Sequence, residues 1–126
     1  MPSPAEAVRE FHTTFDLARN DVPTWPSTEL AALRQRLLVE ETAEVGEAVA
    51  GDDLAAIAQE LADVVYIAYG TAITYGIGLD AVIAEVHRAN MSKLDANGRP
   101  RYRDDGKVAK GPLYQPPDIR AVLGLD

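Results

Sequence analysis

Six acidic residues form two groups on either side of a short break in the sequence. The first group is Glu40, Glu41, Glu44 and Glu47 in "VEETAEVGEA", and the second is Glu60 and Asp63 in "QELADVV". Both groups stand among apolar residues, at spacings of three and four that place side chains on one face of a helix. Carboxylates in such surroundings must be protonated, paired with cations or bound to metal, because burying them charged and alone is costly.

The phase of the first group argues that part of it faces inward. On a helical wheel at about 100° per residue with Glu40 at zero, the apolar residues cover an arc from roughly 20° to 180°. Glu44 falls at about 40° and Glu41 at about 100° on this wheel, whereas Glu40 and Glu47 lie at its margin. A glutamate-rich run is usually a solvated face, but here the phase predicts that Glu41 and Glu44 point into the protein.

The break "GDD" at 51–53 relates the two groups by symmetry. Glu44 and Glu60 each stand seven residues from it, and Glu41 and Asp63 each stand ten residues from it. If the flanking helices run antiparallel, the four carboxylates converge at roughly 10 to 15 Å from the turn. Such a cluster repels itself unless divalent ions fill it, and oxygen-only ligands select hard cations, Mg²⁺ or, as a substitute, Mn²⁺.

Nitrogen and sulfur ligands are scarce in this chain. It has no cysteine, and neither of its two histidines, His12 and His87, follows an acidic residue at the spacing of a di-iron helix bundle. We interpret both histidines as surface or partly packed side chains.

The acidic groups require long helices to position them. Helix-start signals occur at Ser3 with Glu6, at Ser27 or Thr28, at Asp52 or Asp53, and at Asp80. They predict helices over about 3–15, 27–50, 53–76 and 80–95, the last ending before the "NG" at 97–98. We therefore expect one all-α domain over 1–126: a four-helix bundle with its helical core at about 3–95, completed by dimerisation.

The remaining residues, 96–126, form a basic tail that we expect to be irregular. It contains a possible small hairpin around Asp105 and Gly106 and a short helix capped by Asp118. Residues 1–95 hold 6 Lys and Arg against 16 Asp and Glu, whereas residues 96–126 hold 6 against 4. An acidic body with a basic tail could close on a polyanion held by metal ions.

Charge and hydropathy exclude several classes of partner. The net charge of −8 argues against binding a nucleic-acid polymer, which normally needs a basic face. The longest uncharged run, 64–79, is shorter than the roughly 20 residues that cross a bilayer. No signal-peptide pattern is present at the N-terminus, so we expect a cytoplasmic protein that does not bind membranes.

The acidic spacing resembles that of a known family. Glu40-Glu41-x-x-Glu44, fifteen residues, then Glu60-x-x-Asp63 is similar to the EExxE…ExxD signature of MazG-like all-α nucleoside triphosphate pyrophosphohydrolases. The resemblance extends into "HRANMSKLDANGRPRYRDDGKVAKGPLYQPPD" and covers most of residues 8–119. It implies hydrolysis of a nucleoside triphosphate to monophosphate and pyrophosphate with Mg²⁺, by a homodimer or a dimer of dimers.

The resemblance also implies roles for individual residues. The second and third glutamates of EExxE and both acids of ExxD bind metal in relatives, which corresponds here to Glu41, Glu44, Glu60 and Asp63. Glu40, at the edge of the pocket, would act as general base toward the attacking water, or be an exposed helix residue.

Residues outside the acidic groups are candidates for substrate binding. Asn90 and Lys93 resemble an Asn and a Lys that relatives place against substrate, although surface residues would look the same. Lys107 and Lys110, within "DGKVAKGP", would contact phosphates. Trp25 either stacks on a base or fills the gap between the first two helices.

Two other functions fit the same sequence. One is a catalytically idle helical dimer that binds nucleotide or a protein partner and keeps the carboxylates as a structural metal site. The other is a phosphoribosyl-ATP pyrophosphohydrolase, which shares the fold and the position of cleavage. We favour the triphosphate hydrolase, in a role that clears unwanted nucleotides from the pool.

Overall fold

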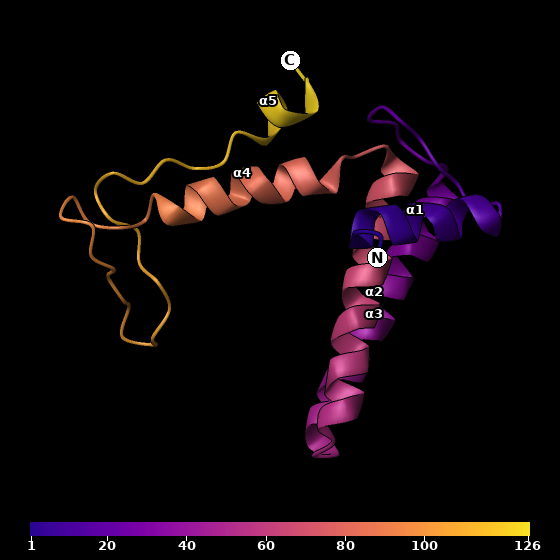
Figure 1. Cartoon of the computed structure of the whole chain (residues 1–126), viewed down its shortest axis with the longest axis horizontal. Coiled ribbons are helices and arrows are strands. Elements are labelled where there is room, and N and C mark those ends of the chain that lie inside the picture. The colour runs from indigo at the N-terminus through magenta and orange to yellow at the C-terminus, as the bar shows by residue number, and fades with distance from the viewer. The chain divides into compact units, whose positions relative to one another are not determined.

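The computed structural model describes all residues, 1–126, and its regular elements are all helices (Figure 1). They are α1 (Pro4–Thr14), α2 (Thr28–Ala50), α3 (Leu54–Tyr75), α4 (Leu79–Met91) and the short α5 (Ile119–Leu123). The chain forms two compact units, Met1–Ile77 with α1 to α3 and Gly78–Asp126 with α4 and α5. The all-α class with four long helices is thus confirmed, whereas the expectation of one domain over 1–126 stays a prediction.

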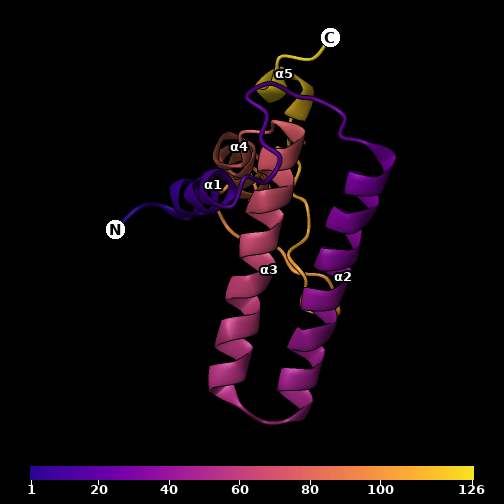
Figure 2. The same ribbon diagram turned by 90° about the vertical axis from the view of Figure 1, so that its right-hand side faces the viewer.

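In the first unit, α2 and α3 lie side by side as an antiparallel hairpin (Figure 2). The Ser27 hydroxyl accepts a hydrogen bond from the Leu30 N–H at the start of α2, and the Asp53 carboxylate accepts from Ala55 and Ala56 at the start of α3. Ser27 and Asp53 are therefore the caps among the alternatives that the sequence offered. The turn between the helices is only three residues long, so it fixes how they align near their joined ends.

Helix α1 packs on α3 and completes the first unit. It begins with the predicted capping box, in which the Ser3 hydroxyl accepts from the Glu6 N–H while the Glu6 carboxylate accepts from the Ser3 N–H. The Phe11 ring meets the Tyr66 ring of α3 edge to face, with centroids 5.6 Å apart.

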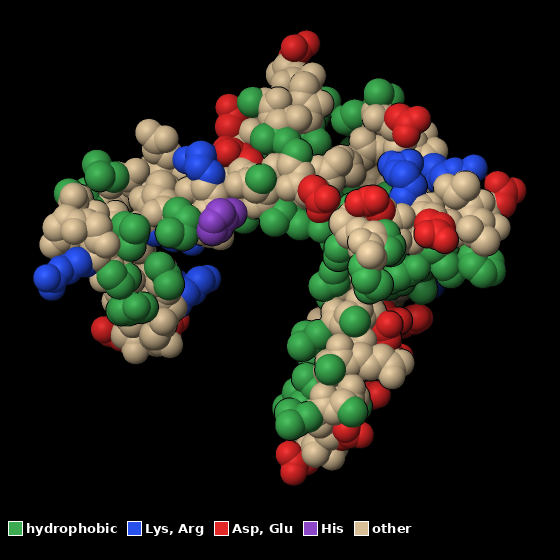
Figure 3. Space-filling view, in the orientation of Figure 1, with side chains coloured by type: hydrophobic (Ala, Val, Ile, Leu, Met, Phe, Trp, Pro, Cys, Tyr) green, Lys and Arg blue, Asp and Glu red, His purple; other side chains and the backbone are tan.

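The buried apolar core of the first unit is small. It consists of Val8, Ala48, Ala72 and Ile73, and Thr74 is also fully buried. Large apolar side chains stay exposed on the same helices, among them Val39 on α2 and Leu54, Leu61 and Val65 on α3. Figure 3 shows such hydrophobic surface along the α2–α3 hairpin. Because α2 packs chiefly on α3, much of its apolar arc is uncovered within this unit.

The loop before α2 caps the far end of α3. Gly76 ends α3 with a φ of 73°, the left-handed conformation typical of a helix C-terminus. The Asn20 side chain donates to the Thr74 carbonyl at 2.8 Å, and the Thr24 N–H donates to the Tyr75 carbonyl at 2.8 Å. This loop therefore satisfies helix-end carbonyl groups that otherwise lack partners.

In the second unit, α4 differs from its predicted bounds at both ends. It begins at Leu79, and its N-cap residue is Gly78, which has no side chain to accept a capping hydrogen bond. Asp80 therefore lies in the first turn of α4 and is not the cap. It ends at Met91 instead of near Asp95, because tail residues take over the backbone groups that follow. The Gly111 N–H, for example, donates to the Lys93 carbonyl at 2.8 Å.

The tail is fastened to α4 by a polar network. Arg88 makes two hydrogen bonds to the Glu85 carboxylate, at 2.8 and 2.9 Å, and donates to the Pro116 carbonyl at 3.1 Å. The Asp118 N–H donates to the same Glu85 carboxylate at 2.7 Å. These bonds from Arg88 and Asp118 lower the pKa of Glu85 to about 2. Asp118 also caps α5, as predicted, by accepting from the Ala121 N–H.

The predicted hairpin in the tail is reduced to one antiparallel bridge, between Tyr102 and Val108. Gly106 sits in its turn with a φ of 84°, and the Arg103 N–H donates to the Lys107 carbonyl at 2.7 Å. No single helix of the chain combines the length and the apolar character needed to cross a membrane.

The end of α3 yields a test of the fold. We expect Gly76→Ala to lower the free energy of unfolding by at least about 2 kcal/mol, because the residue has a positive φ and its new Cβ would collide with the Val22 carbonyl. Gly46→Ala is the matched control: nothing lies within 4 Å of the added Cβ, so it should stabilise α2 by about 0.5 to 1 kcal/mol. Urea unfolding of both variants measures the difference, and equal effects would contradict this account.

Candidate metal centre

Three carboxylates from two helices meet between α2 and α3. Glu41 of α2 and Glu60 and Asp63 of α3 each place one oxygen within 4.8 Å of the others. All three side chains are half-buried, and one oxygen each of Glu41 and Glu60 is buried without any hydrogen-bond partner. The convergence that the spacing around residues 51–53 predicts is therefore present for these three residues.

The surroundings of Glu41 and Glu60 disfavour the charged form of their carboxyl groups. Hydrogen bonding with Glu44, followed by burial and the Glu44 charge, raises the pKa of Glu60 to about 7. Burial, followed by the charge of Glu44, raises the pKa of Glu41. No salt bridge to any member of the cluster is present, so a proton or an added cation must relieve the repulsion.

The donor set fits a hard divalent cation. Two oxygens on opposite sides of a Mg²⁺ ion stand about 4.2 Å apart, so small side-chain adjustments bring oxygens within 4.8 Å of each other into range. The ligands are all carboxylate oxygens, the type that Mg²⁺ and Mn²⁺ prefer. The orphaned oxygens of Glu41 and Glu60 are the polar atoms that a metal ion would satisfy.

The other two glutamates of the first group lie outside this close set. Glu44 is exposed, although it is close enough to raise the pKa of Glu60, and both residues line a groove near the turn. The wheel was therefore wrong about its burial, because α3 covers a narrower arc of α2 than the apolar residues span. Glu40 is also exposed. Metal binding by Glu44 and the general-base role of Glu40 stay predictions.

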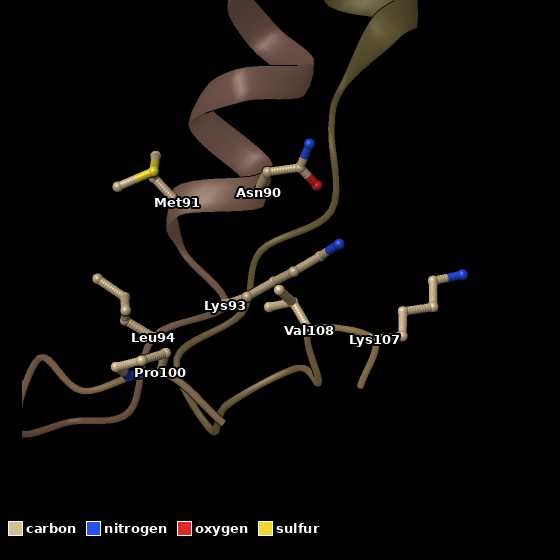
Figure 4. A pocket seen from close by; sticks show the side chains of 7 residues that line it. All are labelled: Asn90, Met91, Lys93, Leu94, Pro100, Lys107 and Val108. Atoms are coloured by element: carbon tan, nitrogen blue, oxygen red, sulfur yellow. The ribbon is translucent and has the colours of Figure 1, made fainter. Parts of the chain in front are cut away.

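Three of the predicted substrate residues line one pocket of the second unit. Asn90, Lys93 and Lys107 surround a cavity of about 470 Å³. Its remaining walls are apolar and consist of Met91, Leu94, Pro100 and Val108. Figure 4 shows the polar ends of Asn90, Lys93 and Lys107 on one side of the pocket and Met91, Leu94 and Pro100 on the other.

Two further candidates lie elsewhere. The Lys110 ammonium stands 4.9 Å from the centre of the Tyr114 ring and does not line this pocket. Trp25 is 87% exposed and meets Tyr75 edge to face, so it does not fill a gap between helices. Stacking of Trp25 on a base stays a prediction.

The sequence did not lead us to predict a buried polar cluster in the first unit, which consists of His12 and Arg34. His12 is only 2% exposed, so its interpretation as a surface or partly packed residue is wrong, whereas His87 is exposed. His12 Nδ1 donates to the Ala18 carbonyl, and its ring packs beside Arg34, which is 7% exposed. The signal was present in the sequence, because the helical wheel puts Arg34 at about 120°, inside the apolar arc.

The raised pKa values predict how stability depends on pH and metal. A carboxylic acid whose folded pKa is about 7 stabilises the folded state most below its unfolded pKa of 4.5 and loses that contribution as the pH rises to about 7. Without metal, the Glu60 contribution to the melting temperature should therefore fall between pH 4.5 and about 7. Added Mg²⁺ should raise the melting temperature more at about pH 8 than at about pH 5, because it binds the deprotonated cluster.

The control is Glu60→Gln, compared with the wild type over the same pH series. Burial lowers the pKa of His12, which gives stability an opposite trend in the same range, and the comparison cancels that contribution. Equal pH profiles and equal Mg²⁺ responses of the two proteins would remove Glu60 from the site.

Comparison with known proteins agrees with this arrangement. Residues 8–90 match the family model described as phosphoribosyl-ATP pyrophosphohydrolase, a range that includes all three clustered carboxylates and ends at Asn90. An uncharacterised protein of Acanthamoeba polyphaga mimivirus is 28% identical over 109 residues, which cover 83% of this chain and 41% of that protein. The chain thus spans about two fifths of the length of this curated relative. By the family match, the chain belongs to the phosphoribosyl-ATP pyrophosphohydrolase family, within the MazG-like all-α group.

Proposed function

We propose that the chain is a Mg²⁺-dependent nucleoside triphosphate pyrophosphohydrolase, which converts (d)NTP and water to (d)NMP and pyrophosphate. The observation that carries this proposal is the close approach of Glu41, Glu60 and Asp63 inside a family of pyrophosphohydrolases. Clearance of unwanted nucleotides in the cytoplasm is the physiological role that we infer from such an activity.

The carboxylates have distinct tasks in this proposal. Glu41, Glu60 and Asp63, with Glu44 beside them, would hold the metal ion. A bound Mg²⁺ ion supplies positive charge for phosphate oxygens and lowers the pKa of a coordinated water. Glu40 is exposed and precedes Glu41 by one residue, so its carboxylate is accessible to accept a proton from the attacking water.

The pocket in the second unit supports a substrate that carries phosphate. Lys93 and Lys107 line it, and neither ammonium group makes a salt bridge in a protein whose net charge is −8. Arg101 and Arg103, in the same tail, are instead paired with Asp95 and Asp105. Two unpaired cations beside one cavity favour an anionic ligand, and the Asn90 amide adds a donor and an acceptor.

The exposed Trp25 ring and the exposed apolar side chains support two further parts of the proposal. Trp25 presents an aromatic surface on which a base can stack. The uncovered apolar residues of α2 and α3 favour association of two copies into a homodimer, or of four into a dimer of dimers, because the buried core of the first unit is small.

A substrate panel tests the proposed activity. The protein is incubated with Mg²⁺ and each ribo- and deoxyribonucleoside triphosphate, and ³¹P NMR identifies the products. We expect monophosphate and pyrophosphate from at least one nucleotide, with turnover abolished in Glu41→Gln and Asp63→Asn. Release of diphosphate and phosphate would contradict the proposed position of cleavage.

The same panel includes phosphoribosyl-ATP, because the description of the matched family favours it as a second candidate substrate. Turnover of phosphoribosyl-ATP alone would replace the proposed substrate class. No turnover of any compound would leave a metal-binding helical protein that holds nucleotide or a protein partner without catalysis.

The lysine pocket yields a separate prediction. Lys93→Met and Lys107→Met should each raise KM roughly tenfold, because each removes a charge that contacts phosphate in both ground and transition states. Arg120→Met on α5 is the control, since it changes the net charge equally but does not line the pocket. If all three variants raise KM alike, net charge is responsible and the pocket is not.

A further inference from the structure

Arg34 is a buried cation whose hydrogen-bond partners are neutral. It is 7% exposed, and burial lowers its pKa. Its Nε donates to the Thr71 hydroxyl at 3.1 Å and its Nη2 donates to the Ile67 carbonyl at 2.9 Å. No carboxylate forms a salt bridge with it. Burying a charge without a counter-ion is unfavourable, and the two hydrogen bonds offset part of that cost.

The two acceptors, the Thr71 hydroxyl and the Ile67 carbonyl, fix the position of α3 relative to α2 both along the helix axis and in rotation about it. Ile67 and Thr71 stand four residues apart, one turn, on the same side of α3. A slide of α3 by one residue, about 1.5 Å, would lengthen both bonds together. Apolar contacts tolerate such a slide, whereas a planar guanidinium bonded to two fixed atoms does not.

The metal centre stands two turns away along both helices. Glu41 is seven residues after Arg34 on α2, and Glu60 is seven residues before Ile67 on α3. Seven residues correspond to about 10.5 Å and a rotation of only about 20°, so each pair lies on nearly the same helix face. The register that joins Arg34 to Ile67 is therefore the register that brings Glu41 to Glu60.

The surroundings of Arg34 hold it in place. A Cβ on Gly70 would lie 2.5 Å from Arg34 Nη2 and 2.8 Å from His12 Nε2, so only glycine leaves room for both side chains. His12 is itself held by the bond from its Nδ1 to the Ala18 carbonyl at 3.0 Å. His12 of α1 thus lies beside the guanidinium, and Arg34 itself is only 7% exposed, so water has little access to its side chain.

We propose that Arg34 is a positioning residue for the metal centre: it fixes the sliding register at which Glu41 meets Glu60 and Asp63. This inference rests on the metal centre of the proposed function and is independent of the nucleotide. The short turn at 51–53 restrains the helices on one side of the cluster, and Arg34 restrains them on the other. Between these two points the repelling carboxylates cannot separate by sliding.

The test compares Mn²⁺ affinity with thermal stability in matched variants of the full chain. Arg34→Met removes both hydrogen bonds at similar length, and Arg34→Lys keeps the charge but cannot bond both acceptors in the same plane. Ile73→Ala is the control, since it removes buried packing on α3 without touching either bond. Mn²⁺ affinity is measured by the EPR signal of free Mn²⁺, and stability by melting of the metal-free proteins.

We expect Arg34→Met to weaken Mn²⁺ binding about tenfold or more, with Arg34→Lys intermediate. Ile73→Ala should keep the wild-type affinity even where it lowers the melting temperature as much. Unchanged Mn²⁺ affinity in Arg34→Met would overturn the proposal. So would a loss of Mn²⁺ affinity that parallels the drop in melting temperature in every variant, Ile73→Ala included. If Arg34→Met does not fold, Arg34→Lys and Thr71→Val decide in the same way.

The wild-type protein separates this inference from the proposed function. Mn²⁺ binding without turnover of any nucleotide refutes the activity and leaves the role of Arg34 to be judged by its variants. Absence of Mn²⁺ binding in the wild type refutes the metal centre, and with it both proposals.

Discussion

Repulsion among carboxylates held between α2 and α3 is the constraint on which the candidate site depends. Glu41, Glu60 and Asp63 lie close together, and two of their oxygens are buried without partners. Helices free to slide would relieve this by moving the charges apart. We infer that the Asp53-capped turn and the two hydrogen bonds of Arg34 oppose that movement. Carboxylates held together in this way favour the binding of protons, and a divalent cation would relieve the same repulsion.

In the same unit, polar contacts and apolar contacts stabilise the fold in different ways. Few apolar side chains of this unit are fully buried. The side chains of Leu61 and Val65, for example, remain exposed. The directed bonds of Arg34 and the close fit of His12 over Gly70 supply geometric definition that a small apolar core does not.

The two units differ in charge. The first unit, 1–77, holds 4 Lys and Arg against 13 Asp and Glu, and the second, 78–126, holds 8 against 7. The three clustered carboxylates lie in the first unit, whereas Lys93 and Lys107 of the second unit lie beside a cavity and have no salt-bridge partners. The network of Glu85 and Arg88 fastens the tail that forms one wall of that cavity.

The sequence by itself determined the helices, most of their caps and the meeting of Glu41 with Glu60 and Asp63. These features depend on residues close in the chain, or on a three-residue turn that sets the register of two long helices. The helical wheel already places Arg34 inside the apolar arc, but only the tertiary structure decided that Glu44 is exposed and that His12 is buried. A helical wheel shows which side chains share a face, but burial depends on how wide an arc the neighbouring helix covers, and that width is set by packing between elements distant in sequence.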